Sequence, residues 1–296
     1  MPEEIPRKIR IIVNPNAGAG KGRELFPLIR QKLLERKISF HLQFAESPEH
    51  VGFLARQAMR EAYDLIVSCG GDGTSHRTLQ ALVGKRAVLG FIPIGRGNDF
   101  PLNLGIREDL DFACDLLLHG RVRRIDVIQI DSGEYMAGVG GIGFDSEVNA
   151  AANRIRRFGG RKSYFLLALG KAFSYRPKQI SLRLDRESIT RTVLLAAFGN
   201  LRSYGHGMQI TPRAEPDDGL LDVCLIDPVG PFRFYRFFPR VYAGKHLARP
   251  EVHYFQSSSA RVDSSVPLAF FGDGEFLCRT PFSLRVIPQA LQVLVP

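Results

Sequence analysis

A glycine-rich turn that carries one carboxylate occupies residues 69–74, whose sequence is CGGDGT. The largely apolar run 64–67 precedes this turn and a helical pattern of apolar residues follows it, so the turn joins a strand to a helix. Such an arrangement directs backbone N–H groups and a helix N-terminus toward an anion, and glycines let the backbone approach it closely. The motif predicts that Asp72 faces phosphates, directly or through a metal ion, and that Thr74 caps the helix. A tight turn with an acidic residue is the alternative.

Two further turns have a similar character. Residues 14–22 read NPNAGAGKG, in which Lys21 suggests a P-loop, but the full P-loop pattern is absent and a glycine-rich β-turn is an equal alternative. Residues 93–99 read PIGRGND. Asn98 and Asp99 stand where helix caps are expected, and on their own they are better explained as caps than as ligands.

Acidic residues gather on turns in the second half of the chain. Residues 212–219 read PRAEPDDG, where Glu215, Asp217 and Asp218 form an oxygen-rich group suited to Mg²⁺ or Ca²⁺. Without further context, a solvated acidic turn explains this group slightly better. Asp273 lies between two glycines just after an apolar strand, which makes it a candidate general base for a hydroxyl nucleophile.

The elements that must position these turns change in character along the chain. Over the first 120 residues strands and helices alternate, which predicts a parallel sheet with helices on both faces and ligands beyond the carboxyl ends of the strands. From about residue 123 short alternating segments predict an antiparallel sandwich or barrel. Strands are expected at 8–14, 39–44, 64–68, 88–92, 181–184, 192–198, 220–226, 252–255 and 268–271, and helices at 23–36, from 47, at 109–118, 163–173 and 232–244.

Composition limits the partners and the compartment. The 296 residues include 40 basic and 30 acidic side chains, a net charge of +10 that suits nucleic acid, anionic membranes or phosphorylated ligands. No nucleic-acid motif accompanies this charge, so no nucleic-acid partner is expected. The four cysteines are far apart and signal neither a zinc site nor a disulfide framework. No apolar run is long enough to span a bilayer, so we expect a cytoplasmic protein with peripheral membrane contact at most.

Six motifs in this order resemble the diacylglycerol kinase catalytic-domain family, which includes bacterial lipid kinases, sphingosine kinases and ceramide kinases. The motifs are NPxAGxGKG, GGDGT, PxGxGND, GxGFD, PxAxxDDGLLDV and GDGE, and they cover nearly the whole chain. The resemblance implies a doubly wound α/β ATP-binding domain over residues 1–125 and an antiparallel β-sandwich lipid-substrate domain over residues 126–281. The last strand, residues 282–296, would return to the first domain.

The same resemblance implies an activity and assigns roles to residues. The chain would transfer the γ-phosphate of ATP, with Mg²⁺, to a lipid hydroxyl, with diacylglycerol as the default acceptor. Asp72 would act at the phosphates and the metal, Asp273 would be the base on the lipid hydroxyl, and Glu275 would support it. The nucleotide site would comprise Asn14, Asn16, Gly70, Gly71, Gly73, Thr74, Gly95, Arg96, Gly97, Asn98 and Asp99.

An additional structural Mg²⁺ site is also implied, formed by Asp218, Glu215 or Asp217, and the carbonyl of Leu220. The chain departs from the family at Arg96, where a threonine is usual, and at Arg77, where a glutamate is common. Either arginine could add phosphate-binding charge or obstruct the usual nucleotide pose.

Membrane docking and the competing functions stay open. A basic cluster at 154–162 and an aromatic cluster at 232–238 are candidate membrane patches, with a solvated helix end and ordinary core packing as the alternatives. A sphingoid base or another glycerolipid could replace diacylglycerol. An NAD kinase lacks support because its Asn-Asn-Glu segment is absent, and a nucleotide or lipid sensor without turnover is the non-enzymatic alternative. The sequence does not decide the oligomeric state, and a homodimer is possible.

Overall fold

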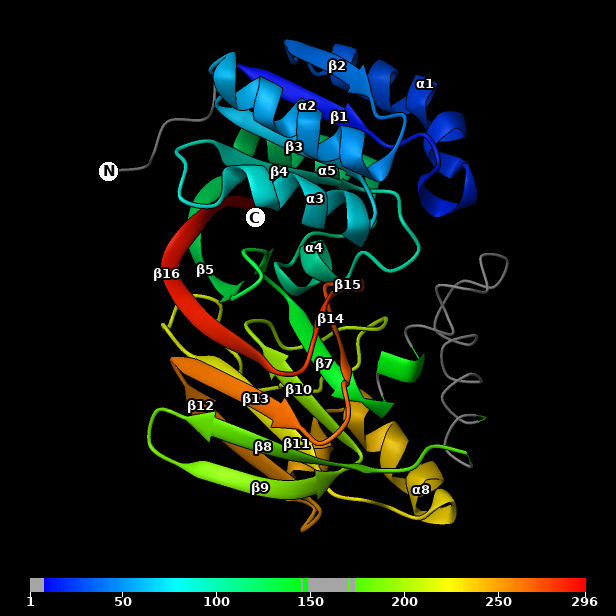
Figure 1. The fold of residues 1–296 in the computed structure, drawn as a ribbon. Coiled ribbons are helices and arrows are strands. Elements are labelled where there is room, and N and C mark those ends of the chain that lie inside the picture. The colour runs from blue at the N-terminus through cyan, green and yellow to red at the C-terminus, as the bar shows by residue number, and fades with distance from the viewer. Residues whose placement is uncertain (1–7, 145, 149–169, 171–173) are drawn as a thin grey trace. The chain divides into compact units, whose positions relative to one another are not determined.

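The computed structural model describes residues 8–144, 146–148, 170 and 174–296 (Figure 1). The chain forms two compact units. One runs to Val127 and also includes Pro288–Pro296, and the other is Ile128–Ile287. The chain crosses between the units inside two strands, β5 (Arg121–Ile130) and β16 (Phe282–Val295).

A parallel sheet forms the centre of the N-terminal unit, with strand order β2-β1-β3-β4 followed by the end of β16. Helices α2 and α3 pack together, as do α1 and α5, so helices cover the sheet on both faces (Figure 1). The elements are β1 (Ile9–Val13), η1 (Ala17–Ala19), α1 (Lys21–Glu35), β2 (Phe40–Phe44), α2 (Pro48–Arg60), β3 (Leu65–Gly70), α3 (Asp72–Leu82), β4 (Val88–Pro93), α4 (Asp99–Asn103) and α5 (Leu110–His119).

Local sequence explains where these helices begin. Ser47 accepts a hydrogen bond from the backbone N–H of His50, and Pro48 at the first helical position has no N–H to satisfy. Asp109 caps α5 in the same way, because its carboxylate accepts from the N–H of Phe112 at 2.7 Å. The three central strands β1, β3 and β4 are buried throughout, as expected for a parallel sheet covered on both faces.

The C-terminal unit is an antiparallel sandwich. One sheet contains the end of β5, from Ile128 on, together with β16, β13, β8 and β9. The other sheet has the strand order β12-β11-β10-β7-β14-β15. A core of apolar side chains from both sheets fills the space between them. The remaining elements are β6 (Tyr135–Met136), β7 (Val139–Gly143), β8 (Lys178–Leu184), β9 (Ser188–Val193), β10 (Leu195–Gly199), β11 (Leu221–Ile226), α8 (Pro231–Tyr242), η2 (Lys245–Ala248), β12 (Val252–Ser257), β13 (Ser259–Ser264), β14 (Ala269–Gly272) and β15 (Glu275–Arg279).

The predicted fold class, an α/β unit followed by an antiparallel sandwich, is confirmed. The single strand expected at 192–198 is wrong, because the chain leaves one sheet at the end of β9 and enters the other at the start of β10. At the crossing residue, Leu194, the N–H donates to Ile226 and the carbonyl accepts from Phe144. The helix expected at 163–173 and the basic cluster at 154–162 lie outside the described residues, apart from Gly170.

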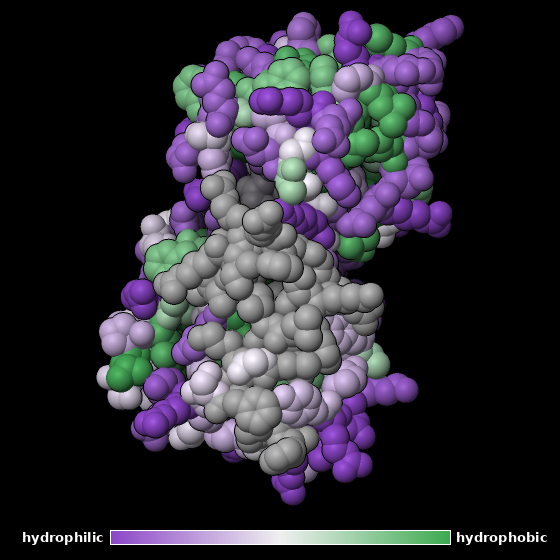
Figure 2. Space-filling view, turned by 90° about the vertical axis from the view of Figure 1, so that its right-hand side faces the viewer, coloured by the Kyte–Doolittle hydropathy of each residue, from purple (hydrophilic) through white to green (hydrophobic). Residues whose placement is uncertain are grey.

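The face of the molecule drawn in Figure 2 is largely hydrophilic outside the grey atoms, and hydrophobic residues lie between the hydrophilic ones in small areas. Within the described part of the chain, no helix is both long enough and apolar enough to cross a membrane.

Candidate active site

Three of the predicted turns meet at one edge of the parallel sheet. They follow β1, β3 and β4, which are neighbours and point in the same direction. The N–H of Asn14 donates to the carbonyl of Cys69 at 3.0 Å, and the N–H of Ile94 donates to Gly70 at 3.0 Å. The sheet ladder therefore continues into the turns and holds them at the carboxyl ends of the strands, where α/β sheets bind ligands.

The turns pack backbone against backbone, and glycine makes this contact possible. A Cβ on Gly95 would lie 2.3 Å from the Cα of Gly71, and a Cβ on Gly18 would lie 2.5 Å from the carbonyl oxygen of Ile94. Neither position has room for any side chain. The sequence predicts that these glycines let the backbone approach a ligand. In the structure they let one loop pack against another.

Asn14 links the first turn to the second. Its Nδ2 donates to the Thr74 hydroxyl at 3.1 Å, and its Oδ1 accepts from the N–H of Asn16 at 3.0 Å. The prediction that Thr74 caps α3 is wrong, because Gly71 occupies the cap position and the helix already begins at Asp72. Thr74 is 4% exposed and serves as a contact beneath the loops, whereas Asn16 is exposed.

Asp72 lies between the starts of two helices. It is the first residue of α3, and its Oδ1 accepts from the N–H of Phe100 in the first turn of α4 at 3.2 Å. Its Oδ2 approaches Gly97 so closely that a Cβ there would be 2.5 Å away. Helix N-termini stabilise a carboxylate, so this position holds Asp72 in one orientation beside the amides expected to receive phosphates.

Asn98 organises the third turn without capping through its side chain. It occupies the N-cap position of α4 with a left-handed backbone (φ 53°), but it makes no side-chain cap hydrogen bond. Its Oδ1 accepts from Gly95 N–H at 3.0 Å and its Nδ2 donates to Glu108 at 2.7 Å. The expected side-chain cap is therefore wrong for Asn98. Asp99 begins α4, and Glu108 is a supporting residue that no sequence signal indicated.

The two family departures lie in different settings. Arg96 is exposed in the third turn, so its charge is placed among the loops that meet at the sheet edge. Arg77 is partly buried on α3, which packs against α2. The pKa of Glu49 on α2 lies below its ordinary value, mainly through hydrogen bonds from its own backbone and Ser47, and the charge of Arg77 adds to this effect. Arg77 thus lies beside α2.

In the C-terminal unit, two backbone amides hold the predicted base. Asp273 lies in the turn between β14 and β15, with a left-handed backbone (φ 52°). Its Oδ1 accepts from Gly138 N–H at 2.8 Å and its Oδ2 from Ala137 N–H at 3.1 Å. A Cβ on Gly138 would lie 2.5 Å from that Oδ1, so glycine is required there as well. Glu275 begins β15 two residues later and is partly buried.

Asn200 completes this arrangement from the other side. It is fully buried, its N–H donates to the carbonyl of Gly138 at 2.9 Å, and its Nδ2 donates to Ala137 at 3.2 Å. The short segment between β6 and β7 is therefore held through both its amides and its carbonyls. Backbone groups of this kind leave little trace in a sequence, and only the glycine at 138 could have indicated them.

The residues expected to bind a structural metal ion have other partners. Arg202 forms an ion pair with Glu215, and Asp218 accepts from the N–H of Leu220 at 3.0 Å. Within the described part of the chain, no group of three or more His, Cys, Asp or Glu side chains could hold a metal ion. The additional Mg²⁺ site stays a prediction. Binding through Glu215 would disturb its ion pair with Arg202, whereas binding through Asp217 would leave that pair in place.

Most described aromatic residues of the 232–238 cluster pack into a second apolar core. Phe234, Phe237 and Phe238 of α8 are 3%, 5% and 7% exposed, and Tyr235 is exposed. Core packing thus explains these three aromatic residues better than a membrane patch does. A narrow apolar cavity of about 20 Å³ lies in this core, between α8 and the sheet that contains β10. It is lined by Phe144, Val148, Leu194, Leu195, Tyr204, Met208, Ile210, Ile226, Phe234, Phe237, Phe238 and Val241.

Two models of known protein families match this chain, one over each of its two units. The model of the diacylglycerol kinase catalytic domain matches residues 8–130, and that of the YegS C-terminal NAD kinase beta sandwich-like domain matches residues 138–295. The chain therefore belongs to the diacylglycerol kinase catalytic-domain family, a family of lipid kinases.

Individual relatives span the chain from end to end. A diacylglycerol kinase of Mycobacterium tuberculosis is 32% identical over 98% of this chain and 95% of its own length. A diacylglycerol kinase of Bacillus subtilis is 26% identical over 98% of this chain and 97% of its own length. Among solved structures, two from Bacillus anthracis str. Sterne share the fold, with TM-scores of 0.83 and 0.76 at 22% and 20% identity. The first covers 99% of both chains, and the second covers 99% of this chain and 98% of its own.

Proposed function

We propose that this protein transfers the γ-phosphate of ATP to the hydroxyl of a lipid, with diacylglycerol as acceptor and phosphatidic acid as product. The observation that carries the proposal is the meeting of three glycine turns around Asp72 at one edge of the parallel sheet. The relatives named diacylglycerol kinase, which match nearly the whole chain, support the choice of acceptor.

The N-terminal unit would bind the nucleotide. The amides at the start of α3 and the loop around Gly95 would face the phosphates, because helix N-termini and glycine loops suit anions. Asp72 would face the metal ion that accompanies ATP, which neutralises charge on the phosphates when bound. A carboxylate already fixed by Phe100 N–H needs little reorganisation to take this role.

The C-terminal unit would bind the lipid. Asp273 would accept the proton of the attacking hydroxyl, with its orientation set by the amides of Ala137 and Gly138. The apolar cavity beneath α8 would take an acyl chain. Because 20 Å³ holds about one water molecule, α8 would have to move to admit the chain.

The test is transfer of labelled γ-phosphate from Mg·ATP to an extracted lipid mixture in mixed micelles. A labelled lipid that comigrates with phosphatidic acid supports the proposal, and comigration with a phosphorylated sphingoid base or other glycerolipid would change the acceptor. A parallel reaction with NAD and no lipid checks the dinucleotide alternative. Nucleotide binding without any labelled lipid would contradict the kinase and favour a sensor.

A further inference from the structure

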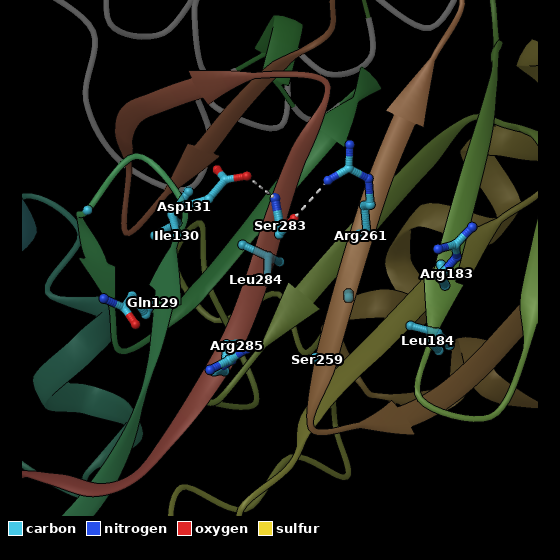
Figure 3. Close-up of a pocket in the computed structure, with 12 residues that line it drawn as sticks. Gln129, Ile130, Asp131, Arg183, Leu184, Ser259, Arg261, Ser283, Leu284 and Arg285 are labelled. Carbon is cyan, nitrogen blue, oxygen red and sulfur yellow. Dashed lines mark hydrogen bonds between the residues drawn. The ribbon is translucent and has the colours of Figure 1, made fainter.

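Three arginines project from one face of the C-terminal sandwich. They are Arg183 on β8, Arg261 on β13 and Arg285 on β16, three adjacent strands, and all three are exposed. The strand register places Arg261 directly opposite Arg183 and places Arg285 opposite Ser259, two residues along β13. Alternate residues of a strand share a face, so the three guanidinium groups lie on the outer face of the sheet (Figure 3).

These arginines line a groove of about 460 Å³, which lies wholly within the C-terminal unit. The hydroxyl-bearing residues Ser259 and Ser283 also line it. The Arg261 guanidinium donates to the Ser283 hydroxyl at 3.5 Å, one of the two dashed contacts in Figure 3. The groove therefore presents hydrogen-bond donors on a concave surface, the form that a small anion requires.

The positive charge in this groove is poorly compensated. Like charges directly opposite each other on neighbouring strands destabilise a sheet. None of the three arginines forms an ion pair with a carboxylate that the structure describes. Two carboxylates lie close by, and Asp131 itself lines the groove, but both are held by serine donors rather than by the arginines. Asp131 accepts from Ser283 N–H at 2.8 Å, and Asp185 accepts from Ser258 N–H and the Ser259 hydroxyl.

We propose that Arg183, Arg261 and Arg285 form a binding site for a phosphate group, separate from the nucleotide-binding turns. Guanidinium groups match the geometry of phosphate oxygens through paired N–H donors, which a lysine cannot provide. A bound phosphate would also offset the repulsion between Arg183 and Arg261. The site lies on strands rather than on a loop, so its geometry is set before the ligand arrives.

A soluble phosphorylated molecule is the preferred source of this phosphate. The groove is on the outer face of one sheet, whereas α8 and its apolar cavity cover the outer face of the other, with the sandwich core between them. A flat membrane that contacts α8 would therefore not face the arginines. A lipid headgroup is the other source of the same chemistry.

The test compares wild type with Arg183→Gln, Arg285→Gln and the double variant. Pyrophosphate binding is measured by calorimetry, and flotation measures binding to phosphatidylcholine vesicles with and without phosphatidic acid. Arg186→Gln is the matched control, because Arg186 is exposed in the turn after β8 but does not line the groove. We expect one equivalent of pyrophosphate to be lost in the double variant, and each single change to weaken that site about tenfold or more.

A second measurement is thermal melting, which does not depend on an assumed stoichiometry. Pyrophosphate should raise the melting temperature of wild type and of Arg186→Gln more than that of the double variant. Arginine-dependent binding to phosphatidic acid vesicles alone would keep the phosphate site and assign it to a lipid headgroup. Equal binding by wild type and the double variant in both arms, or equal losses in Arg186→Gln, would overturn the proposal.

Discussion

The carboxylate oxygens of Asp273 have two tasks, since they accept the backbone hydrogen bonds that hold the side chain and would also accept the proton of the lipid hydroxyl. Because both oxygens accept backbone N–H groups, Asp273→Asn must turn an amide N–H₂ toward one of these donors. We expect lipid phosphorylation to fall about 10²- to 10⁴-fold through loss of the base. We also expect a loss of about 1 to 3 kcal/mol in unfolding free energy, through one unsatisfied amide. Initial rates at saturating ATP and urea denaturation measure the two effects.

Asn200→Ala is the control that separates these effects. It removes the Nδ2 hydrogen bond to the Ala137 carbonyl, keeps the backbone N–H that donates to Gly138, and leaves the Asp273 carboxylate in place. We expect a comparable loss of stability with a much smaller loss of rate. Equal losses of rate in the two variants would show that disturbance of this segment is enough to explain the effect, and would remove Asp273 as the base.

Asp222 carries a buried charge at neutral pH. It is fully buried on β11, and burial raises the pKa of its carboxyl to about 6, although hydrogen bonds from Tyr254 and Gln256 oppose this. The folded state therefore binds the proton more tightly than the unfolded state, so stability falls as pH rises from about 4 to 6. Asp222→Asn should remove that slope and raise the unfolding free energy at pH 7 by about 1 to 3 kcal/mol. Urea titrations of both proteins at pH 4.5 and 7 check this, and an unchanged slope would contradict it.

The three turns of the N-terminal unit depend on glycine because the loops touch, so a single methyl group should separate them. In Gly95→Ala the new Cβ would lie 2.3 Å from the backbone of Gly71, and one of the two loops must move. We expect nucleotide affinity to fall at least about tenfold and the melting temperature to drop by several degrees. Gly52→Ala, inside α2, is the control, where a Cβ meets the flexible end of Arg56 at 3.3 Å and the carbonyl oxygen of Arg77 at an ordinary contact distance of 3.7 Å. It should leave ATP binding intact and preserve or raise stability. Normal nucleotide affinity in Gly95→Ala would contradict the contact.

Sequence periodicity indicated most elements of the first 120 residues and the positions of the turns, but it did not indicate β5, β7 or β13. Glycines and polar residues after apolar strands correctly indicated one edge of the sheet, because parallel strands end on the same side. The details at Thr74, Asn98 and Glu108 could not be predicted, because they depend on which partner each side chain meets from another loop. Threonine is a residue type that often caps helices, but here Gly71, with an extended backbone, is the cap residue, and α3 begins at Asp72. The break between β9 and β10 at Leu194 could not be predicted either. The chain changes sheet there without any change in the pattern of apolar and polar residues.

The two compact units share continuous strands rather than loops. In its first part, β16 pairs with β13 of the C-terminal unit at Phe282–Arg285, and near its end it pairs with β4 at Gln292 and Val293. Residues 291–295 of this strand are buried. Since one hydrogen-bonded strand contributes to both units, damage at its end should be felt by both during unfolding.

Leu294→Ala tests this coupling. Leu294 is fully buried and lies beside Gly120 at the end of α5, so its truncation should lower the unfolding free energy by about 2 to 5 kcal/mol. The chain contains no tryptophan, so Phe53→Trp on α2 and Phe276→Trp on β15, both half exposed, give one unambiguous fluorescence reporter in each unit. If the strand couples the units, Leu294→Ala shifts the urea midpoints of both reporters equally, whereas Leu34→Ala, at a 51% exposed position of α1, shifts neither by more than about 0.5 kcal/mol. A shift confined to the Phe53→Trp reporter would mean that the units unfold independently and that β16 merely connects them.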